Sequence, residues 1–101
     1  MTFWFLDRGG ESENKSIIIY ADNFFEGISM IFDYLTFKHG KMGSDWNVFM
    51  VEEIQKNDKM YEVWSIEIYK GENKKELKTY YFDITSLKSL KKPKQFFKYL
   101  S

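Results

Sequence analysis

The chain reads WNVFMVEEI at 46–54, MYEVWSIEIY at 60–69 and LKTYYFDI at 77–84, with the polar connections QKNDK and KGENKK between these runs. Each run is rich in Val, Ile, Tyr, Phe and Trp, which favour the pleated, half-buried surface of a sheet. Each connection holds Asn together with Asp or Gly, the residues that favour tight turns. The three runs therefore predict an antiparallel meander of three strands.

The alternation of side chains within these runs predicts the register, because a slip by one residue would turn every core side chain outward. A turn at Asn57 and Asp58 places Lys56 opposite Lys59. The pairs that follow are Val51–Trp64, Phe49–Ile66, Asn47–Ile68, Ile66–Tyr80 and Trp64–Phe82, with Ile84 on the same apolar face. The other face collects Val48, Met50, Glu52, Tyr61, Val63, Ser65, Glu67, Tyr69, Leu77, Thr79, Tyr81 and Asp83.

A helix is predicted before the meander. From residue 24 to 38 the apolar residues recur every three or four positions, which places them on one side of a helix. Asn23 followed by Glu26 resembles a capping box, and Gly40 is a suitable helix stop. Gly27 is unfavourable inside a helix, so it indicates close packing of the helix against the sheet.

Two short strands precede the helix, at 3–6 and at 16–21, and a second helix follows the meander. The second strand is apolar enough to lie centrally, and the turn between the two strands can close a hairpin. After the meander, Ser86 can cap one helical turn and Pro93 can open a short helix. The predicted fold is α+β: an antiparallel sheet of about five strands in the order β-β-α-β-β-β-α, with helices packed on one face.

The composition fits a single α+β domain spanning residues 1–101, because 44% hydrophobic residues over this length can fill one core but not two. The chain has no cysteine, which fits a reducing cytoplasm and leaves no disulfide and no thiolate site. The start MTFWFLDRGGE lacks the basic leader of a signal peptide, and no run reaches the ~18 apolar residues of a membrane span. We therefore expect a cytoplasmic protein without a membrane partner.

The formal net charge is zero, but the two signs are separated along the chain. Residues 1–67 carry six basic and twelve acidic side chains, whereas residues 68–101 carry nine Lys and three acidic side chains. Either the two halves pair with each other in the fold, or one end meets a charged partner. The C-terminal end mixes basic and aromatic side chains, which would suit phosphates and bases, although the rings would equally fill the core with the lysines in solvent. These side chains are Lys88, Lys91, Lys92, Lys94, Phe96, Phe97, Lys98 and Tyr99.

No pattern in the sequence indicates catalysis, a metal site or a cofactor. His39 is the single histidine, so neither a His-pair metal site nor a Ser-His-Asp array with a second base can form. At the end of the predicted helix, His39 complements the helix dipole. Glu53 and Glu62 face each other in the predicted register and could furnish an acid–base pair, but a solvated strand edge or a binding surface explains them more simply. We expect no enzyme activity.

One face of the predicted meander combines acidic and aromatic side chains. Large rings offer rigid contact area and anchor protein interfaces, while negative charge steers a basic partner. The alternative is that the C-terminal segment, or residues 3–6 with their flanks, covers this face. The predicted partner-binding residues are Glu52, Glu67, Tyr69, Tyr81 and Asp83.

In size, cysteine-free α+β make-up, 20% aromatic content and acidic surface, the chain resembles the small cytoplasmic immunity proteins of bacterial toxin systems such as contact-dependent inhibition. The resemblance implies a protein that binds and blocks a cognate nuclease toxin, and it carries over no site residue. Small phage-encoded inhibitors are similar by the same criteria. We therefore expect a non-catalytic protein-binding domain, an immunity protein (antitoxin) or stoichiometric inhibitor of a basic partner. The alternatives are a nucleic-acid-binding module that uses the lysine-rich C-terminus and an enzyme with carboxylate catalysis.

Overall fold

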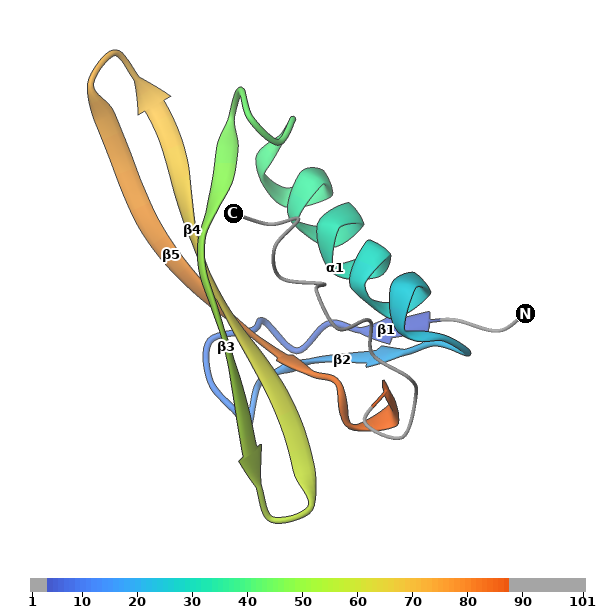
Figure 1. The fold of residues 1–101 in the computed structure, drawn as a ribbon. Helices are drawn as coiled ribbons and strands as arrows, with labels where there is room; N and C mark the ends of the chain where they lie inside the picture. The colour runs from blue at the N-terminus through green and yellow to red at the C-terminus, as the bar shows by residue number, and fades with distance from the viewer. Residues whose placement is uncertain (1–3, 88–101) are drawn as a thin grey trace.

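The computed structural model describes residues 4–87 and has the architecture of a small α+β domain (Figure 1). One long helix lies across one face of a five-stranded sheet, and a short 3-10 turn follows the last strand. The elements in chain order are β1 (Trp4–Leu6), β2 (Ile17–Tyr20), α1 (Phe24–His39), β3 (Trp46–Lys56), β4 (Lys59–Gly71), β5 (Lys74–Asp83) and η1 (Thr85–Leu87). The predicted class and the predicted order of strands and first helix are confirmed.

The strands lie side by side in the order β1-β2-β5-β4-β3. β1 with β2, β5 with β4 and β4 with β3 are antiparallel pairs, but β2 and β5 are parallel. The expectation of an antiparallel sheet is therefore wrong at this one pairing. The physical reason is that a helical crossover brings β3 back in the direction of β2. The chain reverses direction at each of the two hairpin turns that follow, so β5 runs in the same direction as β2, and the two strands pair in parallel.

α1 begins and ends close to the predicted residues. The Asn23 side chain accepts the Glu26 N–H (2.9 Å) and donates to the Glu26 carboxylate (2.5 Å). Gly40, at φ +101°, donates its N–H to the Thr36 carbonyl and ends the helix at His39. Within residues 4–87, α1 is the one α-helix, so the expectation of several helices packed on the sheet is wrong for this part of the chain. No helix among these residues has the length and apolar character to cross a membrane. The helix predicted after Pro93 lies outside the described residues.

The β3–β4 hairpin has the predicted turn. Asn57 and Asp58 have φ values of 52° and 64°, as a two-residue type I′ turn requires, and its geometry matches the twist of the strands. The pairs Lys56–Lys59 and Val51–Trp64 form as predicted.

A β-bulge at Phe49 makes the predicted register wrong beyond that point. Val48, not Phe49, lies opposite Ile66, and Trp46 takes the place expected for Asn47. An extra residue is needed here, because the Trp46 indole and the later core residues of β3 can otherwise not face α1 together. Phe49 is 58% exposed instead of lying under the helix.

The β4–β5 register differs from the predicted one by two residues. Trp64 lies opposite Tyr80, and Ile66 lies opposite Lys78. The two strands extend further into the polar connection than expected and turn at 72–73, where Asn73 has φ 61°. A shift of two residues preserves the faces, so the predicted inward direction of Tyr80 and Phe82 is confirmed by their burial.

The core lies between α1 and the sheet, and two buried indoles occupy it. Phe32 of α1 lies edge-on to Trp64, with ring centroids 5.1 Å apart, and 6.5 Å from the Trp46 ring. Both indole N–H groups are bonded: Trp46 donates to the Gly40 carbonyl (2.8 Å) and Trp64 to the Glu62 carboxylate (2.9 Å). Rings of this size contribute a large part of the buried apolar area.

Gly27 packs against η1 rather than against the sheet. A Cβ atom at this position would lie 2.4 Å from Leu87 Cδ1, and Leu87 is buried. η1 is itself fixed to the sheet, because the Ser86 hydroxyl donates to the Ile19 carbonyl (2.7 Å). The close packing predicted from Gly27 is therefore present, but its partner is the turn after β5.

Trp64→Ala should lower the free energy of unfolding by about 3–5 kcal/mol, because it empties the centre of the core and removes the indole donor of Glu62. Phe49→Ala, the truncation of an exposed ring on the neighbouring strand, should change it by less than about 0.5 kcal/mol. Urea denaturation followed by circular dichroism measures both values. Equal losses in the two variants would contradict the bulge.

A double-mutant cycle tests the contact between Gly27 and Leu87. Gly27→Ala should stabilise a Leu87→Ala background by up to about 1 kcal/mol, because alanine is the better helix former and the methyl group then has space. In the parent chain the same change should give no gain or a loss, since the buried Leu87 side chain must move. The coupling free energy from urea denaturation should be about 0.5 kcal/mol or more. Additive effects would show that the two residues do not touch.

Candidate protein-binding surface

The face of β3, β4 and β5 opposite α1, here called the outer face, is not covered by a helix in the described part of the chain (Figure 1). Its side chains form rows across the strands, because paired residues of neighbouring strands point the same way. In the middle of the face Ser65 Oγ lies 3.3 Å from Thr79 Oγ1. The rows are Ile54–Tyr61–Asp83, Glu52–Val63–Tyr81, Met50–Ser65–Thr79 and Asn47–Glu67–Leu77.

Four of the five predicted partner-binding residues come together on the outer face. Glu52 is exposed, and Glu67, Tyr69 and Tyr81 are half-buried. Lys75 links two of them, because its Nζ lies 3.6 Å from Glu67 Oε2 and 5.9 Å from the centre of the Tyr69 ring. Their contact with a partner stays a prediction.

Asp83, the fifth predicted residue, is buried and has structural partners. Its Oδ1 accepts the Thr85 N–H (2.9 Å) and the Thr85 hydroxyl (2.5 Å), and its Oδ2 lies 4.0 Å from Lys59 Nζ. A carboxylate that accepts the N–H two residues on forms an Asx turn and fixes the start of η1. The structure therefore does not present Asp83 to a partner, although its position in the alternation indicated exposure.

The segment between β1 and β2 covers the lower part of the outer face, which is the end near the turn between β3 and β4. Glu13 forms an ion pair with Lys56 (3.2 Å), so this segment reaches across β5 and β4 to the end of β3. The Gly10 carbonyl accepts the Tyr81 N–H (2.8 Å), and Tyr61 on β4 is buried. The sequence analysis named two segments that could cover this face, and one of them, the flank of the first strand, does cover part of it. The C-terminal segment lies outside the described residues beyond Leu87.

Two apolar side chains extend the exposed part of the outer face. Leu77 is 61% exposed and Met50 is 44% exposed, and they flank the Ser65–Thr79 pair. The sequence placed both on this face but gave no reason to select them, because an apolar residue in a strand usually indicates core. Their outward positions in the alternation of the strands were the feature of the sequence that could have indicated their exposure.

The outer face is less acidic than the sequence suggests, because several of its carboxylates lie near lysines. These pairs are Glu13–Lys56, Asp83–Lys59 and Glu67–Lys75. Of these, Glu67–Lys75 joins a carboxylate of the acidic first part of the chain to a lysine of the basic last part, as the interpretation that the two halves pair with each other expects. Glu13–Lys56 and Glu67–Lys75 are partly exposed to solvent, so they contribute little to stability, but they reduce the field that a partner meets.

His39 lies in a basic cluster on the side of the sheet that faces α1. Its Nε2 lies 2.6 Å from the Tyr80 hydroxyl, so it packs on β5 as well as ending the helix. Burial, and then the charges of Lys78, Lys70 and Lys38, lower the pKa of His39, while Glu76 acts in the opposite direction. The lysines from 88 to 98 that the nucleic-acid alternative uses lie outside the described residues.

The carboxylates considered for catalysis are separated by their environments. Glu53 and Glu62 lie opposite each other as predicted, but Glu53 is exposed, whereas Glu62 is buried and bonded to the Trp64 indole. Among residues 4–87, no group of three or more His, Cys, Asp or Glu side chains lies close enough to hold a metal ion.

The free energy of unfolding should fall as the pH decreases through about 6.5, because the unfolded chain then binds a proton that folded His39 resists. The sign follows from the lowered pKa in the folded chain: between the folded and unfolded values, acid favours unfolding. His39→Gln, which can keep a hydrogen bond to the Tyr80 hydroxyl, should remove this part of the pH dependence. Urea denaturation between about pH 5 and pH 8 measures it. Equal pH dependence in parent and variant would contradict the lowered pKa.

No protein-family model, no curated protein and no solved structure matches this chain.

Proposed function

We propose that this chain is a non-catalytic protein-binding domain that acts as an immunity protein or stoichiometric inhibitor of a basic protein, such as a nuclease toxin. The proposed contact surface is the upper part of the outer face, centred on the Ser65–Thr79 pair. Its partner-binding residues are Glu52, Glu67, Tyr69 and Tyr81, together with Met50 and Leu77. Asp83 is left out because it is buried.

The observation that carries the proposal is the exposure of Leu77 and Met50 on a sheet face that the loop and α1 leave open. Exposed apolar side chains that lie together on a surface and are rimmed by polar groups mark interaction sites. The tyrosines of this face add ring surface with a hydroxyl at the rim.

Charge supports a basic partner over an acidic one. Glu52 lies on the strand at the sheet edge and Glu67 on the central strand of the face, on either side of the Met50 row. Each carboxylate would attract a cationic surface and repel an anionic one. Because Lys75 already lies near Glu67, we expect this charge to set the rate of association more than the final affinity.

The test begins with proteins that co-purify with the chain from its own source cells. A specific partner should bind the parent chain in a one-to-one complex, and Leu77→Arg should abolish the complex, because it places a cation in the middle of the contact. Phe37→Arg changes an 86% exposed ring on α1 in the same way and should leave binding intact. A partner that distinguishes neither variant from the parent would contradict the proposed surface.

Kinetic measurements separate the two contributions to binding. Glu52→Lys with Glu67→Lys should slow association several-fold and reverse its salt dependence, whereas Tyr81→Ala should mainly speed dissociation, by about tenfold or more. Surface plasmon resonance at two salt concentrations measures both rates. If the partner is a nuclease, a one-to-one complex should lose its nuclease activity. An unchanged activity would contradict the inhibitor role while leaving the binding role in place.

Nucleic-acid binding stands as a second candidate because of the basic cluster around His39. Lys38, Lys70 and Lys78 each lie near this residue, on the side of the sheet opposite the outer face. Binding to phosphates would weaken steeply with salt, and changing the three lysines to Glu would abolish it. Fluorescence anisotropy with a labelled RNA and a labelled DNA oligonucleotide tests this. We expect no sub-micromolar complex near physiological salt.

A further inference from the structure

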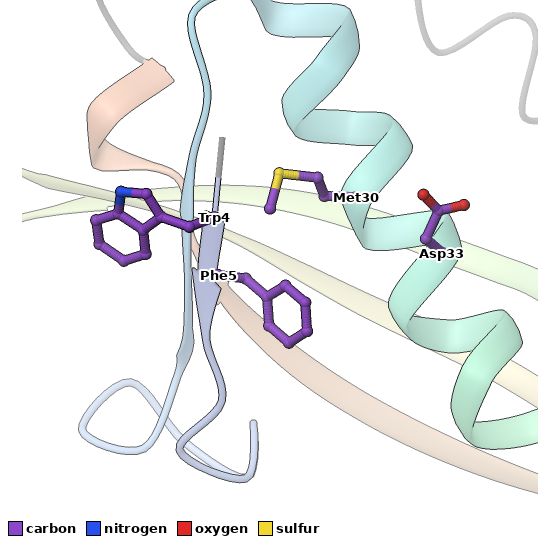
Figure 2. Close-up of a pocket in the computed structure, with 4 residues that line it drawn as sticks. All are labelled: Trp4, Phe5, Met30 and Asp33. Atoms are coloured by element: carbon purple, nitrogen blue, oxygen red, sulfur yellow. The ribbon is translucent and has the colours of Figure 1, made fainter. Parts of the chain in front are cut away.

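A groove between β1 and α1 lies on a different part of the molecule from the outer-face contact. It is open to solvent on one side and has a volume of about 340 Å³, and its described lining residues are Trp4, Phe5, Met30 and Asp33. Figure 2 shows Phe5 pointing from β1 toward α1 and Met30 pointing from α1 toward β1, with Asp33 beside Met30 on the helix. Among these described residues, Asp33 is the one charged side chain and the others are apolar.

Within residues 4–87, β1 is a sheet edge that no further strand covers. It is the terminal strand of the sheet and pairs with β2 on one side. Its three residues are Trp4, Phe5 and Leu6, and they are 47%, 48% and 51% exposed. Edge strands are usually protected by lysine, proline, a bulge or a covering segment, and the described β1 carries no such residue and no bulge. On the side away from β2, where no described strand pairs with it, β1 can accept an added strand.

The charged side chain in the described wall of the groove is acidic. Asp33 lies in its wall. Asp7 lies beside Tyr34, whose ring contacts Phe5 edge-on at 5.9 Å. Burial, and then this Asp7 carboxylate, raises the pKa of the Tyr34 phenol, so the hydroxyl stays neutral and does not add to the charge. Lys38 Nζ lies 5.7 Å from the centre of the same ring, so Asp7 does not act on the groove alone, and the sign of the charge inside the groove is set by Asp33 in its wall.

We infer that β1 and the groove bind an extended peptide segment of a partner protein, which adds a strand to β1 and inserts a lysine or arginine side chain toward Asp33. In an added strand, the residue beside Phe5 points toward α1 and enters the groove. Its two neighbours point to the opposite side, where Trp4 stacks on Tyr20 (5.4 Å between ring centroids), and these positions fit apolar residues. The preferred motif is therefore apolar, basic, apolar in an extended conformation.

This inference does not depend on the proposed function, because Asp33 and β1 lie outside the outer-face contact. The probe is the synthetic peptide acetyl-GSTVRVTSG-amide, titrated into the full chain and followed by amide NMR shifts. Saturable shifts in β1 and around Met30 and Asp33 are expected. The same peptide with Glu in place of Arg should bind at least about tenfold more weakly, because two carboxylates then meet in the groove. The same peptide with Pro in place of both Val should also lose binding, because it cannot pair as a strand while keeping its charge.

Charge exchange tests the role of Asp33 directly. Asp33→Asn should weaken the Arg peptide about tenfold, and Asp33→Lys should reverse the preference so that the Glu peptide binds more tightly. Glu52→Gln on the outer face is the matched control and should change neither affinity. Four results would overturn the inference: equal binding of the Arg and Glu peptides, no saturation by the Arg peptide at about 1 mM, shifts confined to other surfaces, or concentration-dependent protection of β1 amides without peptide. The last result would assign the edge to a second copy of the chain.

Discussion

The burial of two indoles against one helix is the constraint on which the remaining structure depends. Trp46 and Trp64 lie on different strands, yet both must face α1 to leave water. Trp64 sits at a position that the hairpin turn places inward, whereas Trp46 reaches the same side only through the bulge at Phe49. The same requirement fixes the end of the helix, because the Trp46 N–H is bonded to the Gly40 carbonyl that follows α1.

Local signals in the sequence were sufficient for the elements and for most faces. The alternation in the meander located the inward side of β4 and β5, and the Asn23 and Gly40 signals located α1, because each depends on neighbouring residues. The bulge could not be predicted in this way, since no single residue in 46–50 marks the insertion and only the shared burial of distant side chains requires it. The parallel pairing of β2 with β5 could not be predicted for a similar reason. The sequence of a strand indicates which side chains face the core, but it does not indicate which strand lies beside it.

The candidate site was predictable to the extent that it follows from the alternation. Glu52, Glu67, Tyr69 and Tyr81 share a face because each occupies an outward position in a regularly paired stretch of its strand, away from the bulge at Phe49. Asp83 occupies an outward position as well, but the turn after β5 brings a Thr85 donor to it and buries it. The cover over Tyr61 comes from a loop without periodicity, so no pattern could indicate where it lies. The exposed edge of β1 likewise became visible only once the order of the strands was known.

The pairing of β2 with β5 also has a consequence for how the chain acquires this structure. It joins residues 17–18 to 82–83, so the sheet cannot close until nearly all of the described chain is present. Contacts between such distant segments carry the largest loop-closure entropy and slow folding. The hairpins of β3, β4 and β5 involve near neighbours and can form first. On the ribosome, β1 and β2 therefore emerge early but wait for β5, and during this interval their apolar edges are open to chaperones or to other nascent chains.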